Sequence, residues 1–531
     1  MTAVLKGPNT TTPSPSVPAG EILTLTTGID TGPSFVGSSS NDTFNANSVG
    51  IAGAFGLLDN IDGGAGHDTL NVVDTNAIAI SAGQAFIQNI ETINVTDAAT
   101  VTLDTVAYTG LTALNILASN GADAITAAAT TAVSVVDTAA GGVTVDGGSS
   151  QTVSAVGAVT LGATTVTTGA ISVTETGAGQ LATNIVLEGG STVTVASAHN
   201  QGGLITIGGA TQPTGAVVAT TAIDAAQTGG LITINGGTTI NVTESATNAA
   251  GTNVTAESAA TTTSVSVTQA AVAAGASAVT AVTGVNAVAA VVAAPGTQAV
   301  AAVTGISAVD AVTAVAGITA DGAVTIVDVN YNTASANTIT SVTLANYGAS
   351  SVIGDNALAT LSLSGTAGTL AITNATNGAG AVPTANTTLA LTVNGLSGTN
   401  TVTDTNNEIT TLNVTTTGAN STLAAFADTG LTTLHVAGDK ILKLSAINGS
   451  LTSIAVTGAA GFNDGGTTAA NGFAARGAAA TLVTTSSGAI TTSLNSTTQS
   501  FVGSTGVDTI RISALANATQ VITGGSSTSD G

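Results

Sequence analysis

A short pattern of hydrophobic and polar residues recurs along much of this chain. It begins with an aliphatic residue, usually followed by threonine, and then alternates between arbitrary and aliphatic residues, as in residues 111–116 (LTALNI). Similar units begin at Leu358, Ile409, Leu431 and Leu451, and the last three starts lie 22 and 20 residues apart. The last four positions of each unit alternate as a half-buried β-strand requires. Repeats of this length with one strand each predict the coils of a β-solenoid.

Two other repeats have similar lengths. Residues 202–209 and 229–237 are near duplicates, 27 residues apart, and each places the strand-like sequence Leu-Ile-Thr-Ile between glycine pairs. Residues 281–291 and 302–312 share most positions at an offset of 21. Their valines and isoleucines fall three residues apart, which fits neither the helical period of about 3.6 nor the strand period of about 2. Because the offset matches a coil, we predict that this Ala/Val-rich stretch also belongs to the solenoid.

The composition favours an all-β protein. Hydrophobic residues make up 43% of the 531 residues and only 6% are charged, whereas disordered chains combine low hydrophobicity with dense charge. Thr and Val favour strands, and Gly and Asn favour turns. Helix-favouring Glu, Lys, Arg and Met are scarce. Because only 2% of the residues are aromatic, the interior is expected to consist of rows of small branched side chains.

The charge balance excludes some partners and favours others. Five Lys and Arg residues stand against 29 Asp and Glu residues, which gives a net charge of −24. So few basic residues cannot neutralise a phosphate backbone, so nucleic-acid binding is excluded. Docking on anionic lipid is disfavoured for the same reason, whereas divalent cations suit an acidic chain. With no cysteine, disulfides, iron–sulfur clusters and thiol catalysis are also excluded.

Neither an ordinary export signal nor a convincing membrane span is visible. The first 20 residues lack an apolar core of ~7–15 residues, so the chain is expected to be cytoplasmic or exported by a route that reads another signal. The only stretch that suggests a span, residues 270–318, is weakly apolar and is broken by Gly284, Pro295 and Gly305. A spanning helix needs a more strongly apolar run. We therefore predict no membrane span.

The most specific motif is a nonapeptide near the start of the chain. Residues 63–71 (GGAGHDTLN) match the pattern G-G-x-G-x-D-x-U-x, in which U is aliphatic, typical of calcium-binding parallel β-rolls. The glycines allow a turn with φ > 0 and expose carbonyl oxygens, and the aspartate adds a hard carboxylate ligand. Asp42, Asp62 and Asp74 are near enough in sequence to supply further ligands. The alternative is a glycine turn with a purely structural role.

Weaker copies of the nonapeptide lie elsewhere in the chain. Residues 37–44 (GSSSNDTF) precede it, and residues 503–510 (GSTGVDTI) lie near the C-terminus. The final residues, 524–531 (GGSSTSDG), look like an interrupted copy. We therefore expect the chain to be a fragment or a processed product that has lost a C-terminal part.

Together these motifs resemble the surface-layer and related surface proteins of Gram-negative bacteria that leave the cell by type I secretion and carry RTX-type calcium repeats. The resemblance rests on residues 25–30 (LTTGID), 41–46 (NDTFNA) and 60–70 (NIDGGAGHDTL), and on the repeated Leu-Thr-x-Leu units. Its specific motifs lie within residues 21–116 and 501–510, whereas the middle of the chain matches in composition only. The resemblance implies calcium-dependent assembly of a secreted, extracellular coat on the cell surface.

Calcium ligands follow from the same resemblance. In the nonapeptide they are the backbone of Gly63, Gly64 and Gly66 with the carboxylate of Asp68. In the weaker copies the carboxylates are those of Asp42 and Asp508, and the second of these copies adds Gly503 and Gly506.

These observations define a predicted fold and its segments. The fold is all-β, with elongated β-solenoid or β-helix-like coils and RTX-like calcium loops near both ends. The segments are a flexible Pro/Thr/Ser-rich arm (1–20), an RTX-like calcium-binding segment (21–76), a β-solenoid region (77–270), the Ala/Val-rich duplicated segment (271–320), a second β-solenoid region with Leu-Thr-x-Leu repeats (321–460) and a Gly-rich segment with an RTX-like motif (461–531).

The favoured function is a self-assembling surface-layer protein whose calcium ions fix loops and contacts between copies. A homo-oligomeric lattice or fibre is the expected partner, with a cell-surface polysaccharide as a candidate anchor. An adhesin or biofilm-matrix fibre is the alternative. Catalysis is not expected, because a polysaccharide-active enzyme on a β-solenoid needs clustered carboxylates, and the sequence places none beside Arg476 or Arg511.

Overall fold

The structure is a computed structural model of the chain. It describes residues 19–48, 53–97, 99–177, 183–198, 202–223, 230–246, 253–259, 261–269, 321–374, 385–447, 451–465, 481–494, 499–512 and 521–526. Two predicted segments lie wholly or almost wholly outside these residues, namely the Pro/Thr/Ser-rich arm and the duplicated segment 271–320. The interrupted nonapeptide at the C-terminus is described only as far as residue 526.

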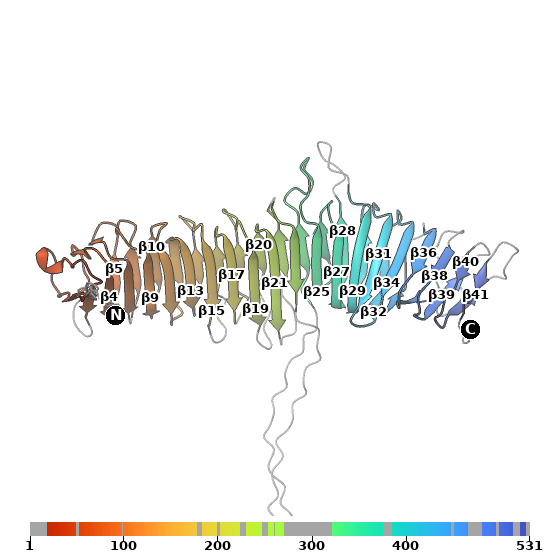
Figure 1. Cartoon of the computed structure of the whole chain (residues 1–531), viewed down its shortest axis with the longest axis horizontal. Coiled ribbons are helices and arrows are strands. Elements are labelled where there is room, and N and C mark those ends of the chain that lie inside the picture. The colour runs from red at the N-terminus through yellow and green to blue at the C-terminus, as the bar shows by residue number, and fades with distance from the viewer. Residues whose placement is uncertain are drawn as a thin grey trace, which may run out of the picture. The chain divides into compact units, whose positions relative to one another are not determined.

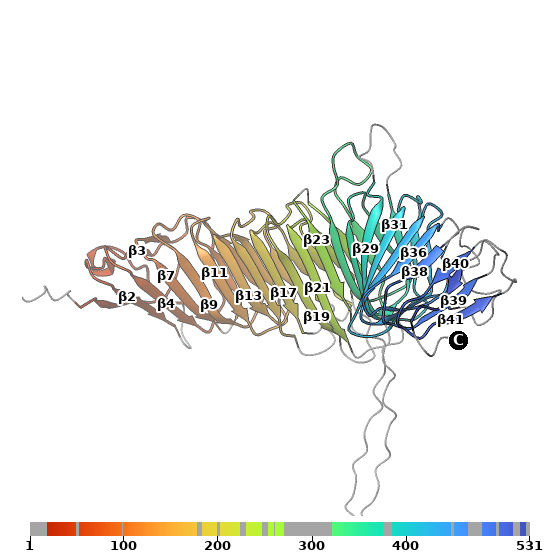
Figure 2. The same ribbon diagram turned by 45° about the vertical axis from the view of Figure 1, so that its right-hand side comes forward.

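The described residues form parallel β-strands, with one short 3₁₀ turn, η1 (Pro33–Phe35). The chain divides into two units, Met1–Gly177 with Val186–Ser191 and Ala178–Ile185 with Thr192–Gly531. Within each unit, every recorded strand pairing is parallel and joins a strand to its counterpart in a neighbouring coil (Figures 1 and 2). The prediction of an all-β solenoid is therefore confirmed.

Unit 1 contains two sheets and one additional strand pair. Sheet 1a consists of β1 (Ile22–Thr24), β2 (Thr43–Asn47), β4 (Thr69–Asp74), β7 (Thr92–Asp97), β9 (Ala113–Ser119), β11 (Ala132–Asp137), β13 (Ser150–Ala155) and β15 (Ala170–Glu175). Sheet 1b consists of β5 (Ile78–Ile80), β8 (Val101–Asp104), β10 (Asp123–Ala127), β12 (Val143–Gly147) and β14 (Val159–Leu161). The pair is β3 (Asn60–Asp62) with β6 (Phe86–Gln88), and β16 (Ile185–Leu187) has residues in both units.

Unit 2 contains three sheets. Sheet 2a consists of β17 (Thr192–Ser197), β19 (Val217–Ile223), β21 (Thr239–Ala246), β23 (Ser264–Thr268), β25 (Ser341–Tyr347), β27 (Thr360–Ala367), β29 (Thr388–Ser397), β31 (Thr411–Thr417), β34 (Thr433–Gly438), β36 (Ser453–Val456), β38 (Thr481–Thr484), β40 (Ser500–Val502) and β42 (Ile522–Thr523). Sheet 2b consists of β18 (Ile205–Ile207), β20 (Ile232–Asn235), β22 (Val254–Glu257), β24 (Val324–Val327), β26 (Ser351–Gly354), β28 (Thr369–Thr373), β30 (Thr401–Asp404) and β33 (Ala425–Ala427). Sheet 2c consists of β32 (Ser421–Leu423), β35 (Ile441–Leu444), β37 (Gly461–Asn463), β39 (Ile490–Leu494) and β41 (Thr509–Ile512).

The repeated hydrophobic unit forms a corner, which is the bend of the coil just before a strand, together with the strand that follows it. In the copy at 431–436, Leu431 lies buried in the corner, and Leu434 and Val436 of β34 point into the core. Leu412, Leu434 and Ile454 are direct partners in successive coils. Each coil thus adds its aliphatic side chains to continuous interior rows, and burial of these rows supplies the main stabilisation.

The threonine of the unit has its own role. The Oγ1 of Thr432 donates to the carbonyl oxygen of Thr410 at 3.1 Å, and that of Thr452 donates to the carbonyl oxygen of Thr432 at 3.3 Å. The backbone N–H groups of the same two threonines donate to the same carbonyls. A hydroxyl at this position therefore adds a second hydrogen bond between coils without needing a long side chain.

The near duplicates 27 residues apart are neighbouring coils. Ile205 of β18 pairs with Ile232 of β20, and Ile207 pairs with Ile234. By contrast, strands that flank the Ala/Val-rich segment pair directly across a long sequence gap, as Val254 with Val324 and Ser264 with Ser341 show. The coils on either side of that segment are therefore direct neighbours, and the coil predicted within it falls outside the described residues.

The interior contains more aromatic rings than the low aromatic content suggests. Phe44, Phe426, Phe462, Phe501 and Tyr347 are among the largest fully buried side chains. Rings thus supplement the small branched residues at particular coils. In the part of the chain that the structure describes, no helix is long and apolar enough to cross a membrane.

Candidate functional site

The nonapeptide lies in unit 1 beside a column of acidic residues. The register of β1, β2, β4 and β7 aligns the residues that directly precede these strands. Those residues are Glu21, Asp42, Asp68 and Glu91. Because neighbouring strands lie about 4.7–4.9 Å apart, four carboxylates stack on successive coils at one edge of sheet 1a.

Hydrogen bonds link three of the four carboxylates of this acidic column to the preceding coil. Asp42 Oδ1 accepts from the N–H of Glu21 at 2.5 Å, and Asp68 Oδ1 accepts from the N–H of Asp42 at 2.6 Å. Glu91 Oε2 accepts from the N–H of Asp68 at 2.6 Å. Asp42, Asp68 and Glu91 thus each bind the backbone of the coil before them, and these bonds hold the three carboxylates in line.

We call residues 37–42, 63–68 and 503–508 the Gly–Asp loops, because each runs from a glycine to an aspartate. Each loop brings a backbone carbonyl close to its carboxylate. A Cβ atom placed on Gly63 would lie 1.9 Å from the carbonyl oxygen of Asn89 and 2.7 Å from Asp68 Oδ2. On Gly37 it would lie 2.3 Å from the carbonyl oxygen of Gly63 and 2.5 Å from Asp42 Oδ2. Glycine therefore lets a carboxylate oxygen and a carbonyl oxygen from the next coil lie close to the loop backbone.

The loop near the C-terminus repeats this geometry in unit 2. A Cβ atom on Gly503 would lie 2.5 Å from the carbonyl oxygen of Gly524 and 2.7 Å from Asp508 Oδ2. The N–H of Gly503 donates to the carbonyl of Thr523, as the N–H of Gly63 donates to that of Gln88. The weak sequence copy therefore repeats the close approach of a carbonyl and a carboxylate oxygen found in the complete nonapeptide.

The other glycines of the motif are required by the backbone. Gly64 has φ 87° and Gly66 has φ 145°, values that favour glycine. A Cβ atom on either would also meet a carbonyl oxygen of the preceding coil, that of Ser38 or that of Ser40. Gly506 shares the second constraint, because a Cβ atom there would lie 2.2 Å from the carbonyl oxygen of Gly488.

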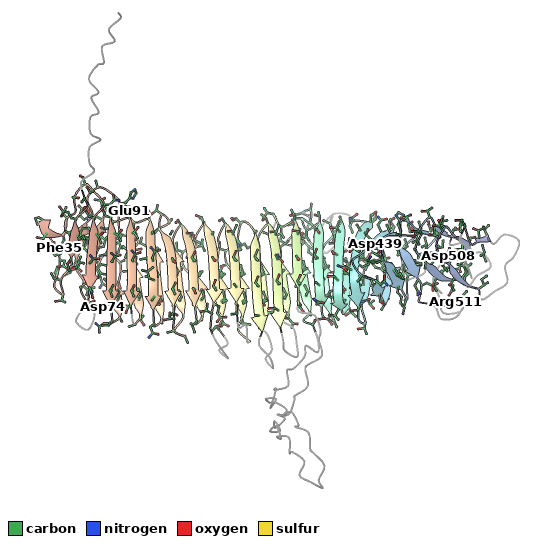
Figure 3. The ribbon with its side chains drawn as sticks, turned by 60° about the horizontal axis from the view of Figure 1, so that its bottom comes forward. Phe35, Asp74, Glu91, Asp439, Asp508 and Arg511 are labelled. Carbon is green, nitrogen blue, oxygen red and sulfur yellow. The ribbon has the colours of Figure 1, made fainter. Side chains whose placement is uncertain are left out.

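Asp62 and Asp74 lie apart from the acidic column. Asp62 Oδ1 accepts from the N–H of Gly64 at 3.0 Å and from Asn89 Nδ2 at 2.8 Å, and so braces the loop. Asp74 ends β4 whereas Asp68 precedes it, and an extended strand of six residues spans roughly 20 Å. Figure 3 places Asp74 and Glu91 at opposite edges of the sheet. The expectation that Asp74 joins the Asp68 loop is therefore corrected by the extended strand between them.

The electrostatics of the acidic column favour a positive ligand. Burial raises the pKa of Asp68 above its usual value, and the nearby carboxylates of Asp42 and Glu91 raise it further. Asp68 is 1% exposed, and its Oδ2 atom has no hydrogen-bond partner. Residues 19–177 contain 14 Asp and Glu residues and no Lys or Arg. A cation beside Asp68 Oδ2 would relieve this repulsion.

The donor set suits calcium in kind. Calcium binds six to eight oxygen ligands, which include backbone carbonyls as well as carboxylates, and the Gly–Asp loops offer both. Among the described residues, no group of three or more His, Asp or Glu side chains is arranged to hold a metal. Calcium in the Asp68 loop would therefore depend on carbonyl oxygens of the glycine turn and of the next coil.

Two members of the acidic column, Glu21 and Glu91, were not predicted as site residues. A sequence signal for Glu91 exists, because an acidic residue, threonine, an apolar residue and asparagine occur together at 42–45, 68–71 and 91–94. The recurrence of this tetrapeptide matches the register of β2, β4 and β7. Glu21 lacks this signature and is placed in the column only by the pairing of β1 with β2.

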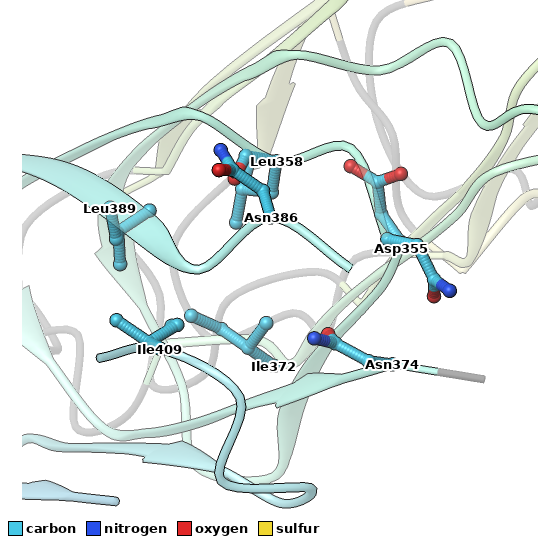
Figure 4. Close-up of a pocket in the computed structure, with 8 residues that line it drawn as sticks. Asp355, Leu358, Ile372, Asn374, Asn386, Leu389 and Ile409 are labelled. Atoms are coloured by element: carbon cyan, nitrogen blue, oxygen red, sulfur yellow. The ribbon is translucent and has the colours of Figure 1, made fainter. Parts of the chain in front are cut away.

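Two cavities among the described residues differ widely in volume. One in unit 2 has a volume of about 10 Å³, which is the space of about one water molecule. Figure 4 shows its lining residues, among which are Asp355, Asn374, Leu358 and Ile409. A concave region of about 450 Å³ in unit 1 is lined mainly by Thr, Ala and Gly of sheet 1b and by Asp123, which is itself buried.

Comparison with known proteins gives no identification. No protein-family model matches the sequence, and no curated protein matches it significantly. The class of the protein is therefore defined by its fold, a parallel β-solenoid, and by the stacked Gly–Asp loops.

Proposed function

We propose that this protein is a structural, self-assembling component of an extracellular surface layer, and that calcium bound in its Gly–Asp loops stabilises it. One observation carries the proposal: Asp68 Oδ2 is buried without a hydrogen-bond partner inside the acidic column, and residues 19–177 contain no Lys or Arg. The ligands would be Asp68, the turn carbonyls of Gly63, Gly64 and Gly66, and the carbonyl of Asn89. Asp42, Gly503, Gly506 and Asp508 would hold further ions in the equivalent loops.

The rest of the fold supports a structural role. Parallel coils bury continuous aliphatic rows and form a rigid scaffold without needing disulfides. A net charge of −24 makes copies of the chain repel one another. Bound or bridging calcium would lower this repulsion, so that assembly into a coat becomes calcium-dependent. Secretion by the type I route, a surface location and a polysaccharide anchor belong to the same proposal.

Imaging of assemblies tests this proposal. We expect purified protein to form regular two-dimensional arrays in electron micrographs with calcium, to disperse when excess chelator is added, and to reassemble when calcium is restored. Arrays that persist in excess chelator would contradict the role of calcium. Isolated fibrils in place of arrays would favour an adhesin or matrix fibre.

A pair of variants separates the calcium site from general charge effects. Asp68→Asn keeps the size of the side chain but removes the charge that faces the loop, so we expect weaker calcium binding by calorimetry and a smaller rise in melting temperature on addition of calcium. Asp104→Asn removes a charge from unit 1 outside the acidic column and should leave both unchanged. Equal losses in the two variants would mean that calcium acts through total charge only.

A further inference from the structure

A second set of buried acidic residues lies at one corner of unit 2. The strands of sheet 2b from β24 to β33 are each followed by, or end in, an aspartate or asparagine. These residues are Asp328, Asp355, Asn374, Asp404 and Asp428, and all are buried. None belongs to a Gly–Asp loop.

Two of these corner aspartates have both oxygens hydrogen-bonded to the backbone. Asp404 Oδ2 accepts from the N–H groups of Glu408 at 2.8 Å and Ile409 at 3.0 Å, and its Oδ1 accepts from that of Asn406 at 3.2 Å. Asp328 accepts three backbone N–H groups in the same manner. Such a set of donors stabilises the charged carboxylate.

Asp428 differs from these two residues. Its Oδ1 accepts from the N–H of Gly430 at 2.6 Å, but its Oδ2 is buried without a donor. The reason is the length of the loop: Asp428 is followed by the corner Leu431 after two residues, whereas Asp404 has four residues before Ile409. The shorter loop has too few N–H groups to reach both oxygens.

The Asp428 carboxyl group faces that of Asp404. Thr403 of β30 pairs with Ala427 of β33, which places the two aspartates side by side on neighbouring coils, close enough for the Asp404 carboxylate to raise the pKa of Asp428. A hydrogen bond between two carboxyl groups requires a proton on one of them. The other acid facing this corner is Glu408, whose Oε2 accepts from Asn374 Nδ2. The described residues of the three neighbouring coils, 369–374, 385–411 and 425–432, contain no Lys, Arg or His.

We propose that Asp404 and Asp428 hold one proton between their carboxyl groups, and that loss of this proton loosens the corner between β30 and β33. The proton resides on Asp428, because Asp404 is the residue with three backbone donors. Burial raises the pKa of Asp428 to about 7, and the Asp404 carboxylate adds to the increase. The corner is therefore a pH-sensitive contact between two coils.

The sign of the effect follows from linkage. The folded state keeps a proton that the unfolded state releases at its ordinary pKa of 3.8. The stabilisation is complete below about pH 4 and is lost as the pH rises towards 7. The titration of this pair alone should increase the equilibrium constant for unfolding at least about tenfold between pH 5 and pH 8.

The variant Asp428→Asn, studied in the full chain with chelator present, tests the proposal. Asparagine donates permanently to Asp404, so this variant should resist urea better than the wild type at pH 8 and should lose the tenfold pH dependence. Hydrogen exchange at the amides of Ile409 and Gly430 should speed up from pH 5 to pH 8 in the wild type, after correction for intrinsic rates, but not in the variant. Asp404→Asn is the matched control, because its amide would face three N–H donors and should destabilise the chain at both pH values.

Two outcomes would overturn this inference. One is an Asp428→Asn variant that is less stable than the wild type by the same amount at pH 5 and pH 8. The other is added calcium that stabilises the wild type at pH 8 but not Asp428→Asn, because a cation rather than a proton would then join the two carboxylates. Neither outcome bears on the Asp68 loop, which belongs to unit 1.

Discussion

Individual glycines in the Gly–Asp loops are under two different constraints. Gly64 and Gly66 need glycine because of their positive φ and because a neighbouring coil passes close to them, whereas Gly63 needs it because of the close coil alone. The second constraint depends on how the coils stack. It also explains why Gly503, in a degenerate copy of the motif, keeps a glycine at the same place relative to its aspartate.

Replacing Gly63 by alanine should therefore be costly. The new Cβ atom would lie 1.9 Å from the backbone oxygen of Asn89, which cannot move without shifting a coil, so we expect a loss of about 2–3 kcal/mol in the free energy of unfolding. Gly28→Ala is the control, because its Cβ would meet nothing closer than 3.6 Å and should change stability by less than about 1 kcal/mol. Urea denaturation of both variants measures the difference, and similar stabilities would contradict the close stacking described here.

At the scale of the strands, asparagine side chains form a ladder on sheet 1a. Asn71 Nδ2 donates to Asn45 Oδ1 at 3.2 Å, Asn94 Nδ2 to Asn71 Oδ1 at 3.0 Å, and Asn115 Nδ2 to Asn94 Oδ1 at 2.9 Å. The four residues are direct partners in β2, β4, β7 and β9. The ladder fixes the register, because a slip of one residue would break every bond in it.

Removing an asparagine from the middle of this ladder should destabilise the chain more than removing one from its end. Asn71→Ala removes two side-chain hydrogen bonds and leaves partners on both sides, whereas Asn45→Ala removes one at the end. With about 1 kcal/mol for each bond, we expect Asn71→Ala to lower the free energy of unfolding by about 2 kcal/mol and Asn45→Ala by about half of that. Chemical denaturation distinguishes the two, and equal effects would show that the bonds contribute nothing specific.

At the scale of the whole chain, buried carboxyl groups make stability depend on pH in an unusual direction. Burial is the largest cause of raised pKa values at Asp355 and Asp428, to about 7, and at Asp123 and Asp321, to about 6. The folded chain keeps protons on these groups that the unfolded chain releases, so stability is greatest near pH 4 and falls as the pH rises towards 7.

In chelator, the free energy of unfolding should therefore decrease from pH 5 to pH 8, by at least about 2 kcal/mol. Repulsion within a chain of charge −24 acts in the same direction. Calcium should reduce the decrease, because ions bound in the Gly–Asp loops would relieve the repulsion within the acidic column. Thermal unfolding across this pH range is the measurement, and a stability that is constant or rises with pH would refute the expectation.

The sequence alone determined the local structure of this protein. Alternation at the Leu-Thr-x-Leu units predicted strands such as β31, β34 and β36, because a half-buried strand exposes every second residue whatever lies beside it. The sequence of residues 63–68 also predicted a turn, since its glycines and aspartate determine the backbone conformation there. These features depend on neighbours within a few residues.

Only the tertiary structure decided which coils are neighbours. The pairing of Val254 with Val324 crosses 70 positions of sequence, and no local pattern encodes that jump. The stacking of coils also places Glu21 and Glu91 in the acidic column and Asp404 beside Asp428. Asp74 lies at the opposite edge of the sheet from the acidic column. These clusters of side chains form through contacts between coils. The sequence predicts such contacts only where its repeats are evenly spaced.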